Sequence, residues 1–210
     1  METKPDYVEL RCRSAFSFLD GASPPEELVQ AAAAGGHDTL ALGDPNGVYG
    51  APRFFAAARK AGIRPIVGAE LALGPDAHGV APPPVLMLVE DRHGYQNLCR
   101  LVTRAWEGRR KDEGPRATHA MLAEHAAGLV ALAGPTARPD LPDLVAAFGT
   151  DNVFLEVQRH HDADEARRAR ATVAQAGIAG VGLVATNDVR YATPDRRPLQ
   201  ARVTSRQRFW

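Results

Sequence analysis

The chain has 210 residues, of which 45% are hydrophobic, and its 25 basic residues balance its 25 acidic residues. This length and this hydrophobic content allow one sizeable core, so we expect a single domain. A net charge of zero excludes a general electrostatic attraction to nucleic acid or to an anionic membrane, so any such contact must be local.

Apolar, strand-like segments alternate with helix-like segments along most of the chain. Strands are expected at residues 7–12, 39–44, 63–73, 84–91, 128–134, 152–159 and 181–188. Helices are expected at residues 23–36, 51–62, 94–108, 118–127, 140–149 and 162–177. Strands separated mostly by helices predict right-handed β-α-β units and a parallel sheet. With seven strands, a closed or nearly closed β/α barrel is favoured over an open doubly wound sheet.

Polar side chains gather where the predicted strands end, which is where folds of this kind carry their chemistry. Four carboxylates and three arginines fall at these ends: Asp20, Asp44, Glu70, Asp188, Arg11, Arg13 and Arg190. Carboxylates suit hard or borderline metal ions. An arginine stays protonated and has no lone pair to donate, so arginines among carboxylates compete with a metal by forming the ion pairs themselves.

Six sequence blocks in order along the chain carry a family resemblance. They are "ELRCRSAFSFLDGASPPEELV", "LALGDPNGVYGAPRFFAAARKAGIRPIVGAELAL", "RHGYQNLCRLVTRA", "GLVALAG", "NVFLEVQRHHD" and "LVATNDVRYATPDRRPLQ". Together they resemble the N-terminal PHP (polymerase and histidinol phosphatase) domain of bacterial C-family DNA polymerases, the DNA polymerase III alpha type. The likeness is greatest to the error-prone, lesion-bypass branch, and it implies a distorted (βα)7 barrel that works in DNA replication and repair.

The resemblance also places the metal motifs of the family on this sequence. Metal-binding PHP proteins hold a trinuclear cluster, usually zinc or manganese, and their first motif is His-x-His, which reads Arg11 and Arg13 here. Their Asp-His motif reads Asp44-Pro45, and their final Asp-x-His motif ends in Arg190. A further ligand position corresponds to Pro135. The acidic ligand positions are kept as Asp20, Asp44, Glu70 and Asp188.

Loss of the nitrogen and sulfur ligands predicts loss of high-affinity metal binding, because such sites depend on the number and geometry of their ligands. We therefore expect no catalytic residue, no bound cofactor and a remnant site in which Arg11, Arg13 and Arg190 compensate the charge of the four carboxylates. The resemblance then implies a structural or interaction module. The alternative is a divergent phosphoesterase or 3′–5′ exonuclease that holds manganese, magnesium or zinc weakly.

The ends of the chain and its cysteines complete the expectations. The family domain covers residues 1–200, and residues 201–210 form a basic and aromatic tail that we expect to be truncated or disordered, with no polymerase body present. Expected partners are that polymerase body or other replication and repair proteins, with weak DNA contact left open at the charged run 107–116. Cys12 and Cys99 read as reduced thiols, and no membrane-spanning or signal-peptide stretch is evident, which predicts a cytoplasmic protein.

Overall fold

The computed structural model describes residues 7–75, 82–110, 113–134, 141–159 and 164–207. The chain divides into two compact units: residues 1–68 with 187–210 form the first, and Ala69–Thr186 form the second. The sequence does not indicate this division, because neither boundary falls in a linker-like stretch. The first boundary lies inside a strand, and the second directly follows one.

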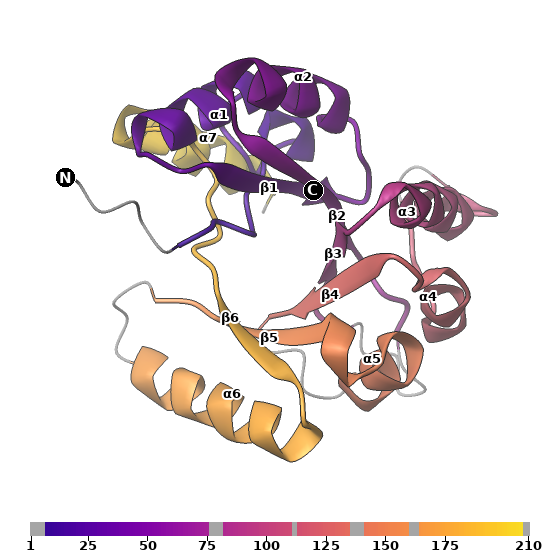
Figure 1. Cartoon of the computed structure of the whole chain (residues 1–210). Helices are drawn as coiled ribbons and strands as arrows, with labels where there is room; N and C mark the ends of the chain where they lie inside the picture. The colour runs from indigo at the N-terminus through magenta and orange to yellow at the C-terminus, as the bar shows by residue number, and fades with distance from the viewer. Residues whose placement is uncertain (1–6, 76–81, 111–112, 135–140, 160–163, 208–210) are drawn as a thin grey trace. The chain divides into compact units, whose positions relative to one another are not determined.

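The first unit contains two adjacent helices beside a buried strand. Its elements are η1 (Ala15–Ser17), α1 (Pro25–Ala34), β1 (Thr39–Pro45), α2 (Ala51–Ala61), the beginning of β2 (Arg64–Leu71), η3 (Pro194–Arg196) and α7 (Arg197–Gln207). Figure 1 shows α1 and α2 side by side on one face of β1. Proline at the first position of α1, followed by two glutamates, favours helix initiation there. Gly62, with φ 73°, ends α2 in a left-handed cap that glycine adopts without strain.

The core of this unit lies between α1, α2 and β1. Its buried side chains are Cys12, Leu28, Val29, Ala32, Leu40, Leu42, Phe54, Ala58 and Ile63. Residues 7–12, expected as a full strand, make only isolated parallel bridges, Glu9 with Leu40 and Cys12 with Val189. The second bridge brings Val189, which follows the last strand of the sheet, against the core of the first unit.

In its described residues, the second unit is a sheet segment with helices packed against it. Its elements are the end of β2, β3 (Val85–Val89), α3 (Arg92–Trp106), α4 (His119–His125), β4 (Leu129–Ala133), α5 (Leu141–Phe148), η2 (Thr150–Asn152), β5 (Val153–Val157), α6 (Glu165–Ala179) and β6 (Gly182–Ala185). Figure 1 shows α6 alongside β5 and β6. Buried aliphatic side chains of β3 and β4, including Leu86, Met87 and Leu132, form its core with Leu98 and Leu101 of α3.

In the described part of the chain, six strands form a sheet in the order β1-β2-β3-β4-β5-β6. The pair of β4 and β5 and the pair of β5 and β6 are parallel. The α/β class with mostly parallel strands is therefore confirmed. The exception is the pair of β3 and β4, which is antiparallel, with Val85 opposite Ala133 and Val89 opposite Leu129. Two helices, α3 and α4, join these strands. The second helix carries the chain back to the end of the sheet that it left, so β4 runs in the reverse direction.

Two further expectations concern the end of the chain and the cysteines. Residues 201–207, expected as part of a tail, belong to α7, whereas residues 208–210 lie outside the described part of the chain. Cys12 and Cys99 are both free thiols.

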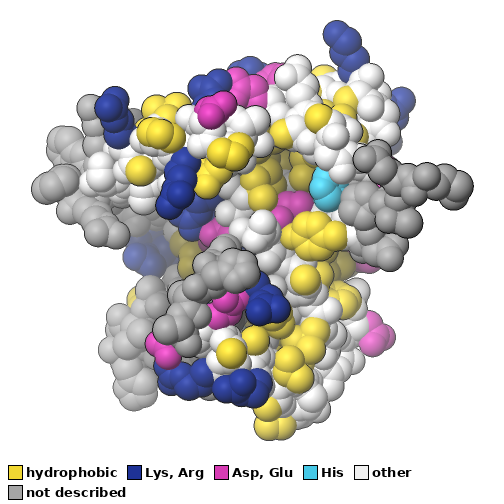
Figure 2. Space-filling model, turned by 90° about the vertical axis from the view of Figure 1, so that its left-hand side faces the viewer, with side chains coloured by type: hydrophobic (Ala, Val, Ile, Leu, Met, Phe, Trp, Pro, Cys, Tyr) yellow, Lys and Arg dark blue, Asp and Glu magenta, His cyan; other side chains and the backbone are white. Residues whose placement is uncertain are grey.

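Within the described ranges, none of the helices has the length and apolar character needed to cross a membrane. Hydrophobic side chains nevertheless reach the surface among Lys and Arg side chains, as Figure 2 shows for one face.

Substitutions at two glycines of the second unit would test how closely α3 packs against the segment around Gly128. A Cβ atom on Gly94, in the first turn of α3, would lie 1.8 Å from the carbonyl oxygen of Gly128. We therefore expect Gly94→Ala to lower the free energy of unfolding by about 2 kcal/mol or more, because backbone must move. Gly177→Ala is the control, since a Cβ there meets nothing within 4 Å in α6. It should raise stability by up to about 1 kcal/mol in urea denaturation. Equal stability of the two variants would contradict this account of the α3 contact.

Candidate functional site

Two strand-end loops of the first unit are joined through Ser14. Its backbone N–H and its hydroxyl each donate a hydrogen bond to the carboxylate of Asp44, at 2.7 Å to Oδ1 and 2.7 Å to Oδ2. The Ser14 hydroxyl also accepts the N–H of Phe16 at 3.1 Å, which caps η1. A Cβ atom on Gly50 would lie 2.6 Å from Asp44 Oδ2, so glycine is required where the next loop crosses. Both oxygens of Asp44 thus accept hydrogen bonds from Ser14, one from its backbone and one from its side chain.

Asp44 is 2% exposed, and its burial raises the pKa of its carboxyl above the usual range. The hydrogen bonds from Ser14 and the charge of Arg13 oppose this shift but do not cancel it. The negative charge of nearby Asp20 adds to the increase. Removing a carboxylate from water disfavours its charged form, so ionisation of Asp44 costs more free energy in the folded protein than in the unfolded chain.

Two aspartates and two arginines, Arg13, Asp20, Asp188 and Arg190, form what we call the Arg–Asp cluster. Arg190 donates from Nη1 to Asp20 Oδ1 at 2.6 Å, and from Nη2 and Nε to Asp188 Oδ2 at 2.7 Å and 3.2 Å. Arg13 donates from Nη1 to the other oxygen of Asp20, and its Nη2 lies 3.6 Å from Asp188 Oδ1. Each arginine therefore spans both carboxylates.

The cluster changes the titration of Asp188. Burial by itself would raise the pKa of this carboxyl, but the guanidinium groups of Arg13 and Arg190 outweigh burial, and the pKa is lowered. Arg11 contributes to the same decrease through its charge. Asp188 is held with φ 51°, a left-handed conformation that aspartate tolerates better than most residues. The charged form of Asp188 is the one that the fold favours.

Backbone contacts fix the strand-like segments that carry the cluster. Arg13 N–H donates to the carbonyl of Val189 at 2.8 Å, and Val189 N–H donates to the carbonyl of Arg11 at 2.9 Å. Ala22 N–H donates to the carbonyl of Arg190 at 2.8 Å. The guanidinium groups are thus presented by backbone that is paired on both sides, so their positions do not depend on the ion pairs alone.

Glu9 is a site residue that the sequence interpretation missed. It is 6% exposed, and its carboxylate accepts the N–H of Arg11 at 2.8 Å, the N–H of Asn187 at 3.3 Å and the hydroxyl of Tyr7 at 2.7 Å. Glu9 lies two residues before Arg11 and four before Arg13, so the period of a strand places all three on one face. That spacing was the available signal, and Glu9 anchors the segment from which Arg13 reaches the cluster.

The remaining predicted residues are not part of the Arg–Asp cluster as defined above. Arg11 is buried in the first unit, at 5% exposure, and its charge acts on Asp188. Glu70 is buried on β2 in the second unit, and Pro135 lies outside the described residues. In the charged run 107–116, the side chain of Arg109 donates a hydrogen bond from Nε to the carbonyl oxygen of Gly114 at 3.2 Å. The structure therefore brings together Asp20, Asp188, Arg13 and Arg190, with Asp44 beside them.

This arrangement leaves few lone pairs for a metal ion. Guanidinium groups occupy both oxygens of Asp20 and one of Asp188, and Ser14 occupies both oxygens of Asp44. No group of three or more His, Cys, Asp and Glu side chains that could hold a metal ion occurs among the described residues. A metal would have to displace arginines that remain protonated at all ordinary pH values. As they are hydrogen-bonded here, the described side chains of the Arg–Asp cluster and of Asp44 do not fit a metal cluster.

Comparisons with known proteins agree with the resemblance. The PHP domain family matches residues 9–160. An error-prone DNA polymerase from Anaeromyxobacter sp. is 42% identical over 208 residues, which are 95% of this chain and 18% of the relative. An error-prone DNA polymerase from Mycolicibacterium paratuberculosis is 39% identical over 92% of this chain and 20% of its own length. The chain thus spans about a fifth of the curated relatives it matches.

Solved structures share the fold at low sequence identity. An amidohydrolase from Chromobacterium violaceum, solved with bound sulfate and no metal, has a TM-score of 0.62 and 17% identity, covering 88% of this chain and 87% of that protein. A protein from Bifidobacterium adolescentis, named as a metal-dependent phosphoesterase, has a TM-score of 0.62 and 16% identity. The match covers 95% of this chain and 97% of that protein. These likenesses confirm the predicted PHP-type fold.

The opposite pKa shifts of Asp188 and Asp44 predict opposite effects of neutralising them. Because the pKa of Asp188 is lowered on folding, its charge stabilises the fold above the unfolded pKa, and this contribution is lost as pH falls through the folded value. Asp188→Asn should therefore cost about 1–3 kcal/mol at pH 7. The difference from wild type should shrink as the pH falls below 3.8, measured by urea denaturation at each pH.

Asp44→Asn should show the reverse trend. The pKa of Asp44 is raised on folding, so wild type loses stability as pH rises from 3.8 through the folded value, and the neutral amide avoids this loss. The amide can still accept from the Ser14 N–H and donate to its hydroxyl. Parallel pH profiles for the two variants would contradict the assigned electrostatics.

Proposed function

Because the chain belongs to the PHP domain family, we propose that it is the N-terminal PHP domain of an error-prone DNA polymerase. Its place is in the cytoplasm, in DNA replication and in repair by lesion bypass. It acts there as a non-catalytic structural or interaction module, with the Arg–Asp cluster in the position of a degenerate metal site. Its partner is the remainder of the polymerase or another replication or repair protein, since the relatives extend well beyond the matched region.

The observation that supports this proposal most directly is that the guanidinium groups of Arg13 and Arg190 form ion pairs with Asp20 and Asp188. These carboxylates match ligand positions of the metal-binding PHP motifs, and Arg13 and Arg190 replace imidazoles there. A guanidinium group supplies positive charge and hydrogen bonds, but it is no Lewis acid and cannot generate a hydroxide nucleophile from a bound water molecule as a metal does. The site therefore retains the electrostatic balance of a metal centre without its chemistry.

The structural role follows from what the cluster connects. Arg13 and Asp20 lie near the start of the chain, and Asp188 and Arg190 lie near its end, so the ion pairs close a very long loop. Asp20 and Asp188 are only 9% and 16% exposed, whereas Arg190 is 32% exposed. Breaking a fully buried pair costs about 3–5 kcal/mol and breaking an exposed one less than about 1 kcal/mol, so an intermediate contribution is expected.

A second candidate is a divergent phosphoesterase or 3′–5′ exonuclease that binds manganese, magnesium or zinc weakly. The name of the Bifidobacterium adolescentis neighbour favours it, because the folds are similar over nearly the whole of both chains. In this reading the carboxylates of Asp20, Asp44 and Asp188 would bind the ion after the arginines move aside. The two candidates differ in metal content and in activity.

Elemental analysis of the protein purified without chelator should find zinc, manganese and iron far below one ion per chain. Incubation with EDTA should leave the melting temperature unchanged, because the Arg–Asp cluster needs no metal. Assays with a chromogenic phosphate ester and with a labelled single-stranded oligonucleotide in added Mn²⁺ should show no turnover above that of Asp188→Asn. Stoichiometric metal, or activity that Asp188→Asn abolishes, would establish the second candidate instead.

A further inference from the structure

A groove in the second unit lies between α5 and the C-terminal half of α6 (Figure 1). Its volume is about 310 Å³, at the lower end of the range for ligand sites, so it suits a few side chains better than a large ligand. Among the described residues that line it, none is charged and one has a polar side chain. They are Leu141, Pro142, Val145, Gln175, Ile178 and Ala179.

Ile178 borders this groove and is 89% exposed. A scattered apolar side chain at a surface is ordinary, but an exposed isoleucine on the rim of an apolar groove marks a surface that another molecule can cover. The opposite side of α6 attaches the helix to its own unit, since Thr172 and Ala176 are each 2% exposed. Ile178 therefore contributes little to the packing of α6.

Arginines follow the same side of α6 toward its N-terminus. Arg167 precedes Ile178 by eleven residues, which is about three full turns, so both lie on one side of the helix. Arg168 precedes Gln175 by seven residues, about two turns, and is exposed. The side chain of Arg167 is 75% exposed even though it lies 3.2 Å from Asp164. The groove therefore continues into a basic stretch of the helix.

The acidic side chains within the two helices are directed away from the groove. Asp143 of α5 lies 3.8 Å from His119 Nδ1 of α4, and it is roughly opposite Val145 around the helix axis. Glu165 of α6 is buried, and its Oε1 lies 3.5 Å from Arg159 Nε. A molecule that enters the groove meets aliphatic side chains and arginines, so charge complementarity favours an acidic one.

We propose that the groove between α5 and α6 docks a short acidic, amphipathic peptide segment of a protein partner. Its aliphatic side chains enter the groove beside Ile178, and its carboxylates face Arg167 and Arg168. The proposal rests on the role of the chain as an interaction module and names the chemistry of the partner that this module binds.

Two other occupants fit the surface less well. A second copy that meets the groove with the same face would bring further arginines and no acidic side chain from α5 or α6 to pair with them. An anionic membrane would also attract arginines, but helices that lie in a membrane interface commonly insert aromatic side chains, and α6 has none.

The test selects peptides on the whole chain from a displayed library of twelve-residue peptides. Leucine stands at two positions four residues apart, and the other positions draw on Asp, Glu, Lys, Arg, Ser and Gln. Wild type should enrich peptides with an excess of acidic residues. The most enriched peptide, labelled with fluorescein, should bind with a dissociation constant in the micromolar range by fluorescence anisotropy, and added salt should weaken its binding.

Variants at the groove should separate the apolar contact from the charge. Ile178→Ser removes the anchor on the rim and should weaken binding of the labelled peptide about tenfold. Arg167→Gln/Arg168→Gln keeps long polar side chains but removes two charges. It should weaken binding about fivefold or more and reduce the dependence of affinity on salt.

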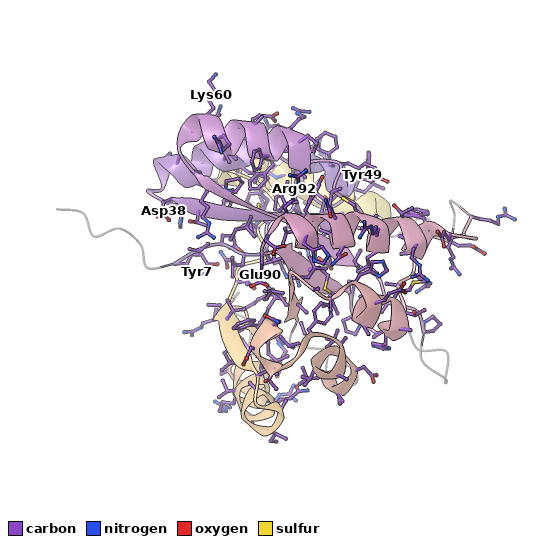
Figure 3. All side chains as sticks on the ribbon, turned by 45° about the vertical axis from the view of Figure 1, so that its right-hand side comes forward. Tyr7, Asp38, Tyr49, Lys60, Glu90 and Arg92 are labelled. Carbon is purple, nitrogen blue, oxygen red and sulfur yellow. The ribbon has the colours of Figure 1, made fainter. Side chains whose placement is uncertain are left out.

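Two matched controls lie away from the groove. Val173→Ser replaces an apolar side chain of α6 that is 51% exposed and lies about 140° around the helix from Ile178. Lys60→Gln removes a cation of the first unit, which Figure 3 shows extending from α2. Both should leave the affinity unchanged. All the variants should keep the melting temperature of wild type, so a loss of binding cannot be attributed to unfolding.

Enrichment of basic or uncharged peptides, or of no peptide, would overturn the inference, as would an affinity that Ile178→Ser leaves unchanged. Dimerisation that depends on Ile178 in analytical ultracentrifugation would assign the groove to a second copy. Cosedimentation with phosphatidylglycerol and phosphatidylcholine vesicles that depends on Ile178 would assign it to a membrane. Either result would overturn the assignment to a peptide. Metal content and turnover test the proposed function separately, so the inference can fail while that role stands.

Discussion

The bridge from Arg190 to Asp20 and Asp188 is the contact on which the first unit depends. It joins side chains 170 residues apart in the sequence, and Arg13 repeats the bridge from the other side. Two carboxylates this close and this buried would repel each other strongly if they were left alone. A positive charge between them is therefore a requirement of the fold, and the guanidinium groups meet it with directed hydrogen bonds that a simple cation would lack.

The same chemistry limits what the site can do. Carboxylates that accept hydrogen bonds from guanidinium N–H groups are no longer available as metal ligands. Both carboxylate oxygens of Asp44 accept hydrogen bonds from Ser14. The residues around them are held by backbone pairing between the segments at 11–13 and 188–190. Rigid presentation of paired charges suits a module that holds its surroundings in place. We therefore propose that the unit acts through its surfaces.

Much of this arrangement could be predicted from sequence, and the failures have physical causes. The positions of Arg13, Asp20, Asp188 and Arg190 at strand ends predicted that they would meet, because parallel strands end at one edge. The role of Asp44 was not predictable in the same way, since it depends on how the turn at Ser14 folds back. Glu9 was overlooked because its neighbours are apolar, although its spacing to Arg11 places both on one face.

The fold followed the same pattern. Helices with clear end signals, such as α2 before Gly62, fall where the sequence predicts them. The antiparallel β4 was missed because strand direction depends on how two consecutive helices pack, which no local pattern records. α7 was missed because its few apolar residues, such as Leu199 and Val203, are scattered among polar ones and form no continuous stripe, so periodicity gives little signal.

The central claim is that guanidinium groups replace metal charge, and Mn²⁺ rescue of stability tests it most directly. Arg13→Ala/Arg190→Ala should melt well below wild type, and millimolar Mn²⁺ should recover part of that loss where sodium at equal ionic strength does not. Wild type and the exposed-arginine control Arg53→Ala should show no response to Mn²⁺. Stabilisation of wild type by Mn²⁺, or a double variant as stable as wild type, would contradict the account.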